Sequence, residues 1–218
     1  MNVNPALAAI EAGLEVLFPE PRCALDHADA WQLLVATVLS AQSTDVRVNE
    51  VTPPLFARYP CAAAMAAAET EDLLPTIRTV GLFNNKAKSL VGLSRLLVER
   101  HAGVVPNDLD ALTALPGVAR KTANVVLQNI WNRNEGFVVD THVARLSGRL
   151  GLSAAATPEK IERDLMACFA RDVWGRRSHQ LILLGRSFCG ARRPECGVCP
   201  LRLHCPTGRG TPPDEAAP

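Results

Sequence analysis

The chain has 218 residues, of which 48% are hydrophobic, 21% charged and 5% aromatic, and its formal net charge is +1. A chain of this length and composition can bury one large hydrophobic core or two smaller ones, which excludes a wholly disordered protein. Taken as a whole, 23 Lys and Arg against 22 Asp and Glu give no sign of a nucleic-acid partner. Abundant alanine and leucine with few aromatic residues favour helices over strands.

The charges are segregated along the chain. Residues 1–30 contain five acidic residues and one arginine, whereas residues 173–210 contain seven arginines and one acidic residue, a net charge of +6. Surface charges further apart than about 8 Å are largely screened at physiological salt, so a polyanion responds to the local charge. The C-terminal segment is therefore either a polyanion-binding surface or an ordinary solvated basic face.

The two ends of the chain carry no signal for export or membrane insertion. The N-terminal segment lacks a basic region and carries Glu11 and Glu15 within its apolar stretch, unlike a secretory or organellar leader. No apolar run approaches the roughly 18 residues that a membrane-spanning helix needs. We therefore expect a cytoplasmic protein with no membrane segment, and a disordered tail in the Pro- and Gly-rich residues 207–218.

The periodicity of apolar residues predicts helices throughout the chain. Residues 5–18 place leucine and isoleucine on one face, and residues 31–41 are apolar on nearly all sides, which is typical of a helix buried in a bundle. Asn107 is a candidate N-cap for the helix that follows it, and Thr157 with Pro158 marks a further helix start. We expect an all-α fold of about ten helices.

Residues 115–123, LPGVARKTA, predict a tight turn between two helices. The amides of such a turn and of the next helix start have no partner within the helix, and they bind a phosphate without reading sequence. Lys121 directly follows the turn. It either holds a phosphate or acts as a nucleophile, helped by the helix N-terminus and by burial, both of which disfavour its ammonium form.

Asp140, in VVDTHVAR, is the candidate partner of Lys121. A helix over residues 119–131 carries the chain about 18 Å away from Lys121, and residues 132–139 can span about 26 Å, so the chain can return. Asp140 is then the expected N-cap of the next helix. Because an ionised Asp140 would raise the pKa of the lysine, we expect it to stabilise positive charge on a substrate and to shuttle protons.

Four of the seven cysteines lie within seventeen residues, at the spacing C-x6-C-x2-C-x5-C. A disulfide framework is not expected in a cytoplasmic chain with a large helical body. Structural zinc usually uses two short-spaced pairs, of which there is one here, and His204 could replace the last cysteine. A single wrapped loop of four thiolates suits a cuboidal iron-sulfur cluster. The spacing favours that cluster but leaves zinc and coincidence open for Cys189, Cys196, Cys199 and Cys205.

In this order, these motifs resemble the endonuclease III family of DNA glycosylases, in the helix-hairpin-helix superfamily. The resemblance runs from about residue 28 to residue 205 and includes LLVATVLSAQSTDVRVN, TVGLFNNKAKSL, LPGVARKTANVV, VVDTHVARLSGRLG and the cysteine loop. It implies an all-α fold of two domains. Residues 24–134 would form a six-helix barrel with the hairpin, and residues 1–23 and 135–206 an iron-sulfur cluster helical domain.

The resemblance implies a bifunctional DNA glycosylase and AP lyase of base excision repair, a monomer that acts on damaged double-stranded DNA at the nucleoid. Lys121 would attack the anomeric carbon of an oxidised pyrimidine nucleotide flipped out of the duplex. β-Elimination from the resulting Schiff base would cut the strand 3′ to the lesion, with Asp140 as the acidic partner. The four cysteines would hold a 4Fe-4S cluster that folds the basic loop and takes no part in the chemistry.

The resemblance also assigns contacts with DNA. Gln42 matches the residue that fills the vacated space, and Leu82 matches the apolar wedge in the other strand. Asp45 matches an acid at the base pocket. Arg192 and Arg193, in the first loop of the cysteine cluster, would face the DNA backbone.

The hairpin departs from the family pattern LPGVG at its second glycine, which is Ala119 here. The resemblance places both Gly117 and Ala119 at a phosphate. If position 119 needs a positive φ or a close approach, alanine costs about 1 kcal/mol and weakens the phosphate site. If the position only begins the helix, alanine is harmless.

Two other functions remain open. A monofunctional glycosylase removes a mismatched or damaged base with water, and such family members lack a lysine at the position of Lys121. A noncatalytic iron-sulfur protein that binds DNA would use Lys121 only to hold phosphate. Borohydride trapping on abasic DNA distinguishes an AP lyase from both.

Overall fold

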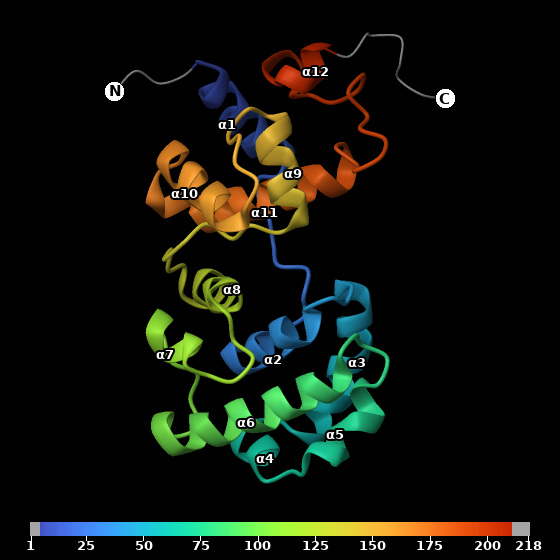
Figure 1. Cartoon of the computed structure of the whole chain (residues 1–218), viewed down its shortest axis with the longest axis vertical. Coiled ribbons are helices and arrows are strands. Elements are labelled where there is room, and N and C mark those ends of the chain that lie inside the picture. The colour runs from blue at the N-terminus through green and yellow to red at the C-terminus, as the bar shows by residue number, and fades with distance from the viewer. Residues whose placement is uncertain (1–4, 211–218) are drawn as a thin grey trace. The chain divides into compact units, whose positions relative to one another are not determined.

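The computed structural model describes residues 5–210, and this part of the chain is all-helical, as predicted (Figure 1). It forms twelve α-helices and two 3-10 helices, and its one β-type pairing is an isolated bridge between Cys189 and Pro194. Two compact units make up the chain. We call Cys23–Glu135 the inserted unit, and Met1–Arg22 with Gly136–Pro218 the split unit.

The helix α2 lies at the centre of the inserted unit, and most of its side chains are buried in the core of that unit. Eight of the eleven residues of α2 are buried, which confirms the fully buried helix predicted at residues 31–41. Its N-cap is Asp29, which accepts a hydrogen bond from Gln32 N at 2.8 Å. In Figure 1, α6 runs alongside α4 and α5. The helices of this unit are α2 (Ala30–Ser40), α3 (Asp45–Arg58), α4 (Ala62–Ala66), α5 (Thr70–Ile77), α6 (Phe83–His101), α7 (Leu109–Thr113) and α8 (Arg120–Trp131).

The split unit has its own hydrophobic core, to which the two ends of the described chain both contribute. The first helix buries Ile10 and Leu14, as its periodicity predicts, and it packs against α11 beside α9 (Figure 1). No described helix is both long and apolar enough to cross a bilayer. The elements are α1 (Pro5–Leu17), α9 (Thr141–Arg149), α10 (Pro158–Cys168), η1 (Arg171–Val173), α11 (Trp174–Ser187), η2 (Arg202–His204) and α12 (Pro206–Gly210).

Two helix starts test the capping predictions. Thr157 is the N-cap of α10 with Pro158 at the first helical position, as predicted. The prediction of Asn107 as a cap is wrong by one residue. Asp108 caps α7 because its extended backbone lets the carboxylate accept a hydrogen bond from Ala111 N at 3.0 Å.

The tail begins later than predicted. Residues 207–210, expected to be disordered, belong to α12, and the remaining residues 211–218 lie outside the described part of the chain. The helix is tied to α9, since Thr207 Oγ1 donates a hydrogen bond to Arg149 O at 3.1 Å. Gly208 N also donates to Cys205 Sγ at 3.4 Å, which links the helix to the cysteine loop.

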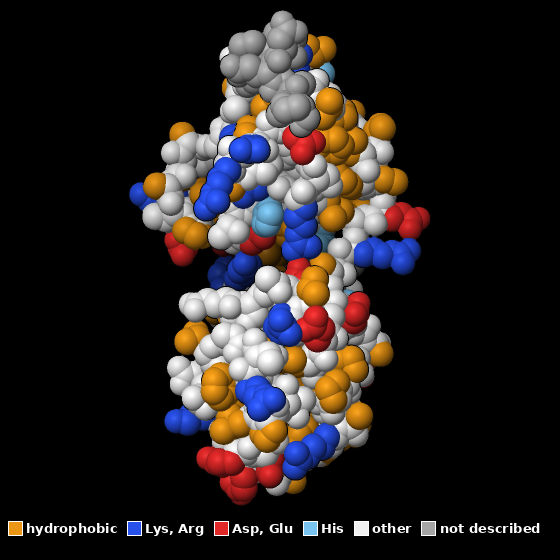
Figure 2. All heavy atoms as spheres, turned by 90° about the vertical axis from the view of Figure 1, so that its right-hand side faces the viewer, with side chains coloured by type: hydrophobic (Ala, Val, Ile, Leu, Met, Phe, Trp, Pro, Cys, Tyr) orange, Lys and Arg blue, Asp and Glu red, His pale blue; other side chains and the backbone are white. Residues whose placement is uncertain are grey.

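The acidic N-terminal segment and the basic C-terminal segment pair with each other inside the split unit. Arg176 and Arg177 on α11 both donate to the Glu15 carboxylate on α1. The side chain of Arg177 is only 7% exposed, and it also donates to Gln180 Oε1 at 2.6 Å. Two of the seven arginines are thus already paired with an acidic residue of the protein. On the face shown in Figure 2, Lys and Arg are interspersed with uncharged and hydrophobic side chains.

This pairing predicts acid sensitivity. The hydrogen bond from Arg176 lowers the pKa of Glu15 from 4.5 to about 2, against the opposite effect of burial. The ionised carboxylate therefore stabilises the fold fully above the unfolded pKa, and this contribution is lost as the pH falls from about 4.5 to about 2. Because Glu15 is about one-third exposed, we expect a contribution of only about 1 kcal/mol.

Thermal unfolding monitored by circular dichroism across that pH range measures the effect. Glu15→Gln should flatten this part of the stability profile. The matched control is Glu50→Gln, whose exposed carboxylate forms an ion pair with Arg47 of the inserted unit and should leave the profile nearly unchanged. An equal slope in Glu15→Gln and the wild type would contradict the prediction.

Candidate active site and cysteine centre

The hairpin between α7 and α8 has the backbone that the LPG turn predicts. Gly117 has a φ of +77°, and a Cβ placed on it would lie 2.6 Å from Ser89 Cβ. Val118 N donates to Leu115 O at 3.1 Å and closes the turn. Glycine is required here both for its backbone conformation and for the approach of α6.

The backbone at Ala119 tests whether this position needs a positive φ. It is the N-cap of α8, with a φ of −80°, and no side chain caps the helix there. This backbone conformation is ordinary for an L residue, so alanine introduces no strain. Position 119 therefore begins the helix and needs no positive φ.

The hairpin predicts a contrast between two substitutions. Gly117→Ala forces a side chain into the left-handed region and against Ser89, and should lower the free energy of unfolding by about 2 kcal/mol or more. Ala119→Gly should change it by less than about 0.5 kcal/mol, because glycine is at least as good an N-cap as alanine. Urea unfolding measures both, and titration of an abasic duplex shows whether affinity follows. A large gain in affinity for Ala119→Gly would mean that the alanine does weaken the phosphate site.

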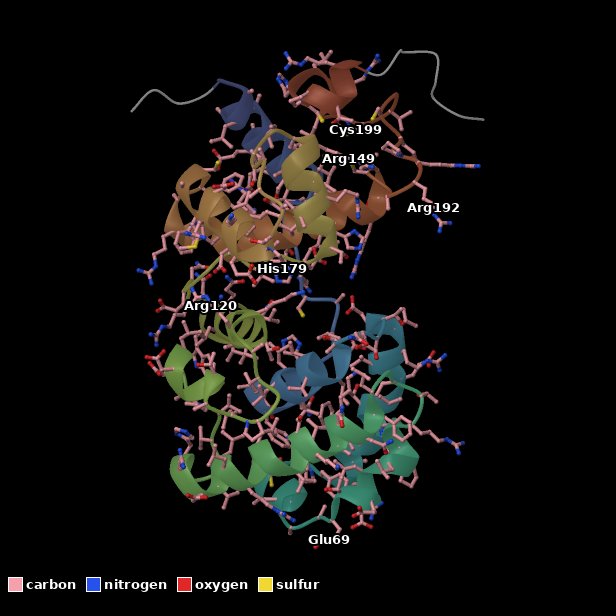
Figure 3. The ribbon with its side chains drawn as sticks, in the orientation of Figure 1. Glu69, Arg120, Arg149, His179, Arg192 and Cys199 are labelled. Atoms are coloured by element: carbon pink, nitrogen blue, oxygen red, sulfur yellow. The ribbon has the colours of Figure 1, made fainter. Side chains whose placement is uncertain are left out.

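Lys121 is the second residue of α8 and is exposed. The expected burial of Lys121 is therefore not found in this structure. It makes no hydrogen bond or ion pair with any residue of the described range. Its neighbour Arg120, labelled beside α8 in Figure 3, donates to Glu135 O at 2.9 Å. Lys121 is thus available to a ligand at the end of the hairpin.

Gln42 and Leu82 lie on two neighbouring segments of the inserted unit. Gly81 N donates to Ser43 Oγ at 3.0 Å, which joins the segments. Both candidate side chains are exposed, and both backbones are left-handed, with φ of 55° and 56°. For a non-glycine residue this costs about 1–2 kcal/mol. Leu82 is 54% exposed and caps α6, so it is not an ordinary core leucine.

Asp45 is the first residue of α3 and is half-buried. It directly follows the N-cap Thr44, whose hydroxyl accepts a hydrogen bond from Arg47 N at 3.3 Å. The carboxylate is thereby placed at the positive end of the α3 dipole, close in sequence to Gln42.

Lys86 was missed by sequence reasoning. It is 5% exposed, and its ammonium donates to three oxygen atoms of the segment that ends α2. Burial lowers its pKa. The available signal was periodicity: Lys86 stands four and seven residues before Leu90 and Leu93, on the buried face of α6.

Asp140 is the N-cap of α9, as predicted, and its Oδ1 accepts a hydrogen bond from Val143 N at 2.8 Å. It lies in the split unit, whereas Lys121 lies in the inserted unit. His179 on α11 belongs to the same surroundings. Burial lowers the pKa of His179, Arg186 lowers it further, and the Asp140 carboxylate opposes this. Asp140 thus caps α9, and its carboxylate also acts electrostatically on His179.

The four clustered cysteines line one pocket of the split unit. Burial raises the pKa of the Cys199 thiol, and the three other cysteines raise it further. No three His, Cys, Asp or Glu side chains of the described residues are positioned to hold a single metal ion together. The four thiols nevertheless converge on one pocket whose other lining residues are mostly apolar, which suits a polynuclear cluster held by four thiolates.

Two arginines of α9 hold the loop that follows the first cysteine, and sequence reasoning missed both. The Arg149 guanidinium donates to Cys189 Sγ at 3.2 Å and to Gly190 O at 2.8 Å. Arg145 donates to Cys189 O at 3.0 Å. Their spacing of four residues, one helical turn, was the signal in ARLSGR. Figure 3 shows Arg149 and Cys199 in the same region of the split unit.

Arg192 and Arg193 are exposed in the loop between the first two cysteines. Arg192 points outward from the ribbon in Figure 3. The turn below them is tight, since a Cβ on Gly190 would lie 3.0 Å from Arg193 O. The loop therefore presents two cations to solvent from a short, well-anchored turn.

Known proteins resemble this chain over most of its length. Residues 35–171 match the family model of the HhH-GPD superfamily of base excision DNA repair proteins. Endonuclease III of Synechocystis sp. is 48% identical over 198 residues, which cover 91% of this chain and 90% of that protein.

Two solved structures are similar over nearly the whole chain. A non-covalent endonuclease III–DNA complex has a TM-score of 0.89 at 38% identity and covers 96% of this chain and 98% of its own. A trapped endonuclease III–DNA covalent intermediate has a TM-score of 0.86 at 39% identity and covers 93% and 97%. With a matching superfamily model and this identity over nearly its full length, the chain belongs to the endonuclease III family of the HhH-GPD superfamily.

Proposed function

We propose that this protein is a bifunctional DNA glycosylase and AP lyase that removes oxidised pyrimidines from duplex DNA in base excision repair. The observation that carries the proposal is Lys121, an exposed amine without a partner in the described structure, directly behind a turn suited to a phosphate. A phosphate held at Gly117 and Ala119 brings the adjoining sugar to that amine. The related endonuclease III that was trapped covalently on DNA supports this chemistry.

The reaction assigned to Lys121 is a displacement followed by an elimination. The neutral amine bonds to C1′ of the flipped nucleotide as the glycosidic bond breaks, and the base leaves with a proton. The sugar opens to a protonated Schiff base. Loss of a C2′ proton then expels the 3′ phosphate and cuts the strand. We assign Asp140 to the stabilisation of positive charge on the sugar and to the proton transfers, and Asp45 to the base pocket.

We assign the contacts with DNA to four exposed side chains. Gln42 and Leu82 fill the space that the flipped nucleotide leaves, and Arg192 and Arg193 contact the backbone. Their exposure in the structure supports these roles. Two of the seven C-terminal arginines pair with Glu15 instead, so the attraction for DNA is more local than the charge count predicts. We assign residues 24–134 to the barrel domain, and residues 1–23 and 135–206 to the cluster domain.

The cofactor assigned to the cysteine pocket is a 4Fe-4S cluster held by Cys189, Cys196, Cys199 and Cys205. It would supply a cross-link for the loop and no reacting atom. Arg149, which donates to the Cys189 sulfur, would stabilise a thiolate at that position. We place the protein in the cytoplasm, as a monomer acting at the nucleoid.

An excision assay on matched duplexes tests the proposal. Thymine glycol and dihydrouracil duplexes should be cut 3′ to the lesion, and an abasic duplex should give a covalent adduct with borohydride. Base release from a mismatch without strand cleavage would favour a monofunctional glycosylase. Binding without any adduct or base release would leave only a DNA-binding protein.

A further inference from the structure

The buried ammonium group of Lys86 caps the C-terminal end of α2. Lys86 Nζ donates to the carbonyl oxygens of Leu39 and Ala41, at 2.7 and 2.6 Å. Its third hydrogen bond goes to Ser43 Oγ at 3.1 Å. An ammonium group has three donors, so every donor of Lys86 is used.

The charge of Lys86 is balanced by the backbone. The carbonyl groups that it contacts lie at and just beyond the last turn of α2, where carbonyls lack helical partners and the helix dipole is negative. No ion pair joins it to an acidic residue of the described chain. A lysine whose aliphatic chain only covers apolar surface would extend its ammonium group into water. Lys86 is instead 5% exposed, which indicates a specific structural task.

Ser43 extends this contact to a second segment. Its Oγ also accepts a hydrogen bond from Gly81 N at 3.0 Å. A Cβ on Gly81 would lie 2.8 Å from Gln42 O, so the two backbones touch. Beside these contacts, Gln42 and Leu82 both hold left-handed backbones, with φ of 55° and 56°. Non-glycine residues keep such conformations only where their surroundings enforce them.

We propose that Lys86 is a positioning residue: it clamps the Gln42 and Leu82 segments in the conformation that presents both side chains to the opened duplex. The inference rests on the proposed function, in which these two side chains fill the vacated stack. Without the ammonium, the carbonyls at the end of α2 take up water and the two segments relax independently. DNA must then order them during binding, which costs both affinity and rate.

Lys86→Met tests this on two substrates. On a thymine glycol duplex, single-turnover excision should slow by about 10- to 100-fold, because the side chains that hold the duplex open are misplaced. On an abasic single strand there is no stack to hold open, and borohydride adduct formation should stay within about twofold of wild type. A general loss of folded protein would slow both reactions equally.

A double-mutant cycle adds a second measurement. If Lys86 acts through Leu82, then Leu82→Ala should slow excision from the thymine glycol duplex much less in the Lys86→Met background than in wild type. Additive effects would contradict the proposal. Lys88→Met is the matched control: it removes an exposed charge from the same helix and should leave the ratio of duplex to single-strand rates unchanged.

The outcomes separate the two claims. A wild-type protein that traps no abasic DNA overturns the proposed function. A wild type that traps it, with Lys86→Met slowed equally on both substrates, overturns only the positioning role. Should Lys86→Met fail to fold, Ser43→Ala provides the test, because it keeps the buried charge and removes the link to Gly81. It should slow the duplex reaction alone, by a smaller factor.

Discussion

Lys121→Gln is expected to abolish the borohydride adduct with abasic DNA and to slow strand cleavage by about 1,000-fold or more. Glutamine has no amine that can bond to C1′, so the base cannot be displaced by the side chain and no Schiff base can form. Because Lys121 is exposed and unpaired within the described structure, its replacement should leave the fold intact. Binding to an abasic duplex, measured by fluorescence anisotropy, should change by less than about tenfold, the loss of one phosphate contact.

Lys121→Arg is the matched variant that separates catalysis from phosphate binding. Arginine keeps the positive charge but stays protonated, and therefore cannot act as a nucleophile. We expect binding close to wild type with no adduct. If Lys121→Arg retained both binding and strand cleavage, the lysine would be a phosphate ligand and the nucleophile would be another group.

Cys199→Ser is expected to bleach the broad absorbance near about 400 nm of a 4Fe-4S protein, to remove its iron and to unfold the cysteine loop. The structure indicates why unfolding of the cysteine loop should destabilise the core of the split unit. Leu201, two residues on, is 1% exposed, and its side chain would lie 2.2 Å from a Cβ on Gly13 of α1. Losing the loop uncovers the core between α1, α9 and α11, so the melting temperature should fall by several degrees and DNA binding should weaken.

Cys168→Ser is the matched control for this experiment. Cys168 is a partly buried free thiol in the same unit, but it lies outside the cysteine pocket. Its replacement should keep the colour and the iron content. Iron analysis and thermal unfolding of both variants provide the comparison. A colourless wild type that contains one zinc would show that the assigned cofactor is wrong.

Local patterns predicted the helices and their capping well. The apolar run at residues 31–41 and the pair Thr157 and Pro158 correspond to α2 and to the start of α10. Asp140 caps α9 as expected. These features depend on neighbours within a few residues, and such interactions can be recognised in the chain itself. The error at Asn107 has the same origin, because adjacent Asn and Asp are both good caps.

Long-range pairing was beyond the reach of those patterns. The net charge of +6 in residues 173–210 counts Arg176 and Arg177 as available, but both bind Glu15, more than 160 residues away in the chain. The hydrogen-bond partners of Lys86 were beyond those patterns for the same reason. Its acceptors are about 45 residues distant, and only packing of α6 against the end of α2 brings them together.

The sequence by itself determined the fold class and the family, and it predicted the residues that would carry the chemistry: the hairpin lysine, the capping aspartate and the four thiols. Motifs carry this information because the chemistry depends on residue type and spacing. Only the tertiary structure decided that Ala119 is unstrained, that two arginines are paired within the split unit, and that the buried ammonium of Lys86 donates to the segment that ends α2. Backbone angles and burial arise from contacts between distant segments, and these exist only once the chain is folded.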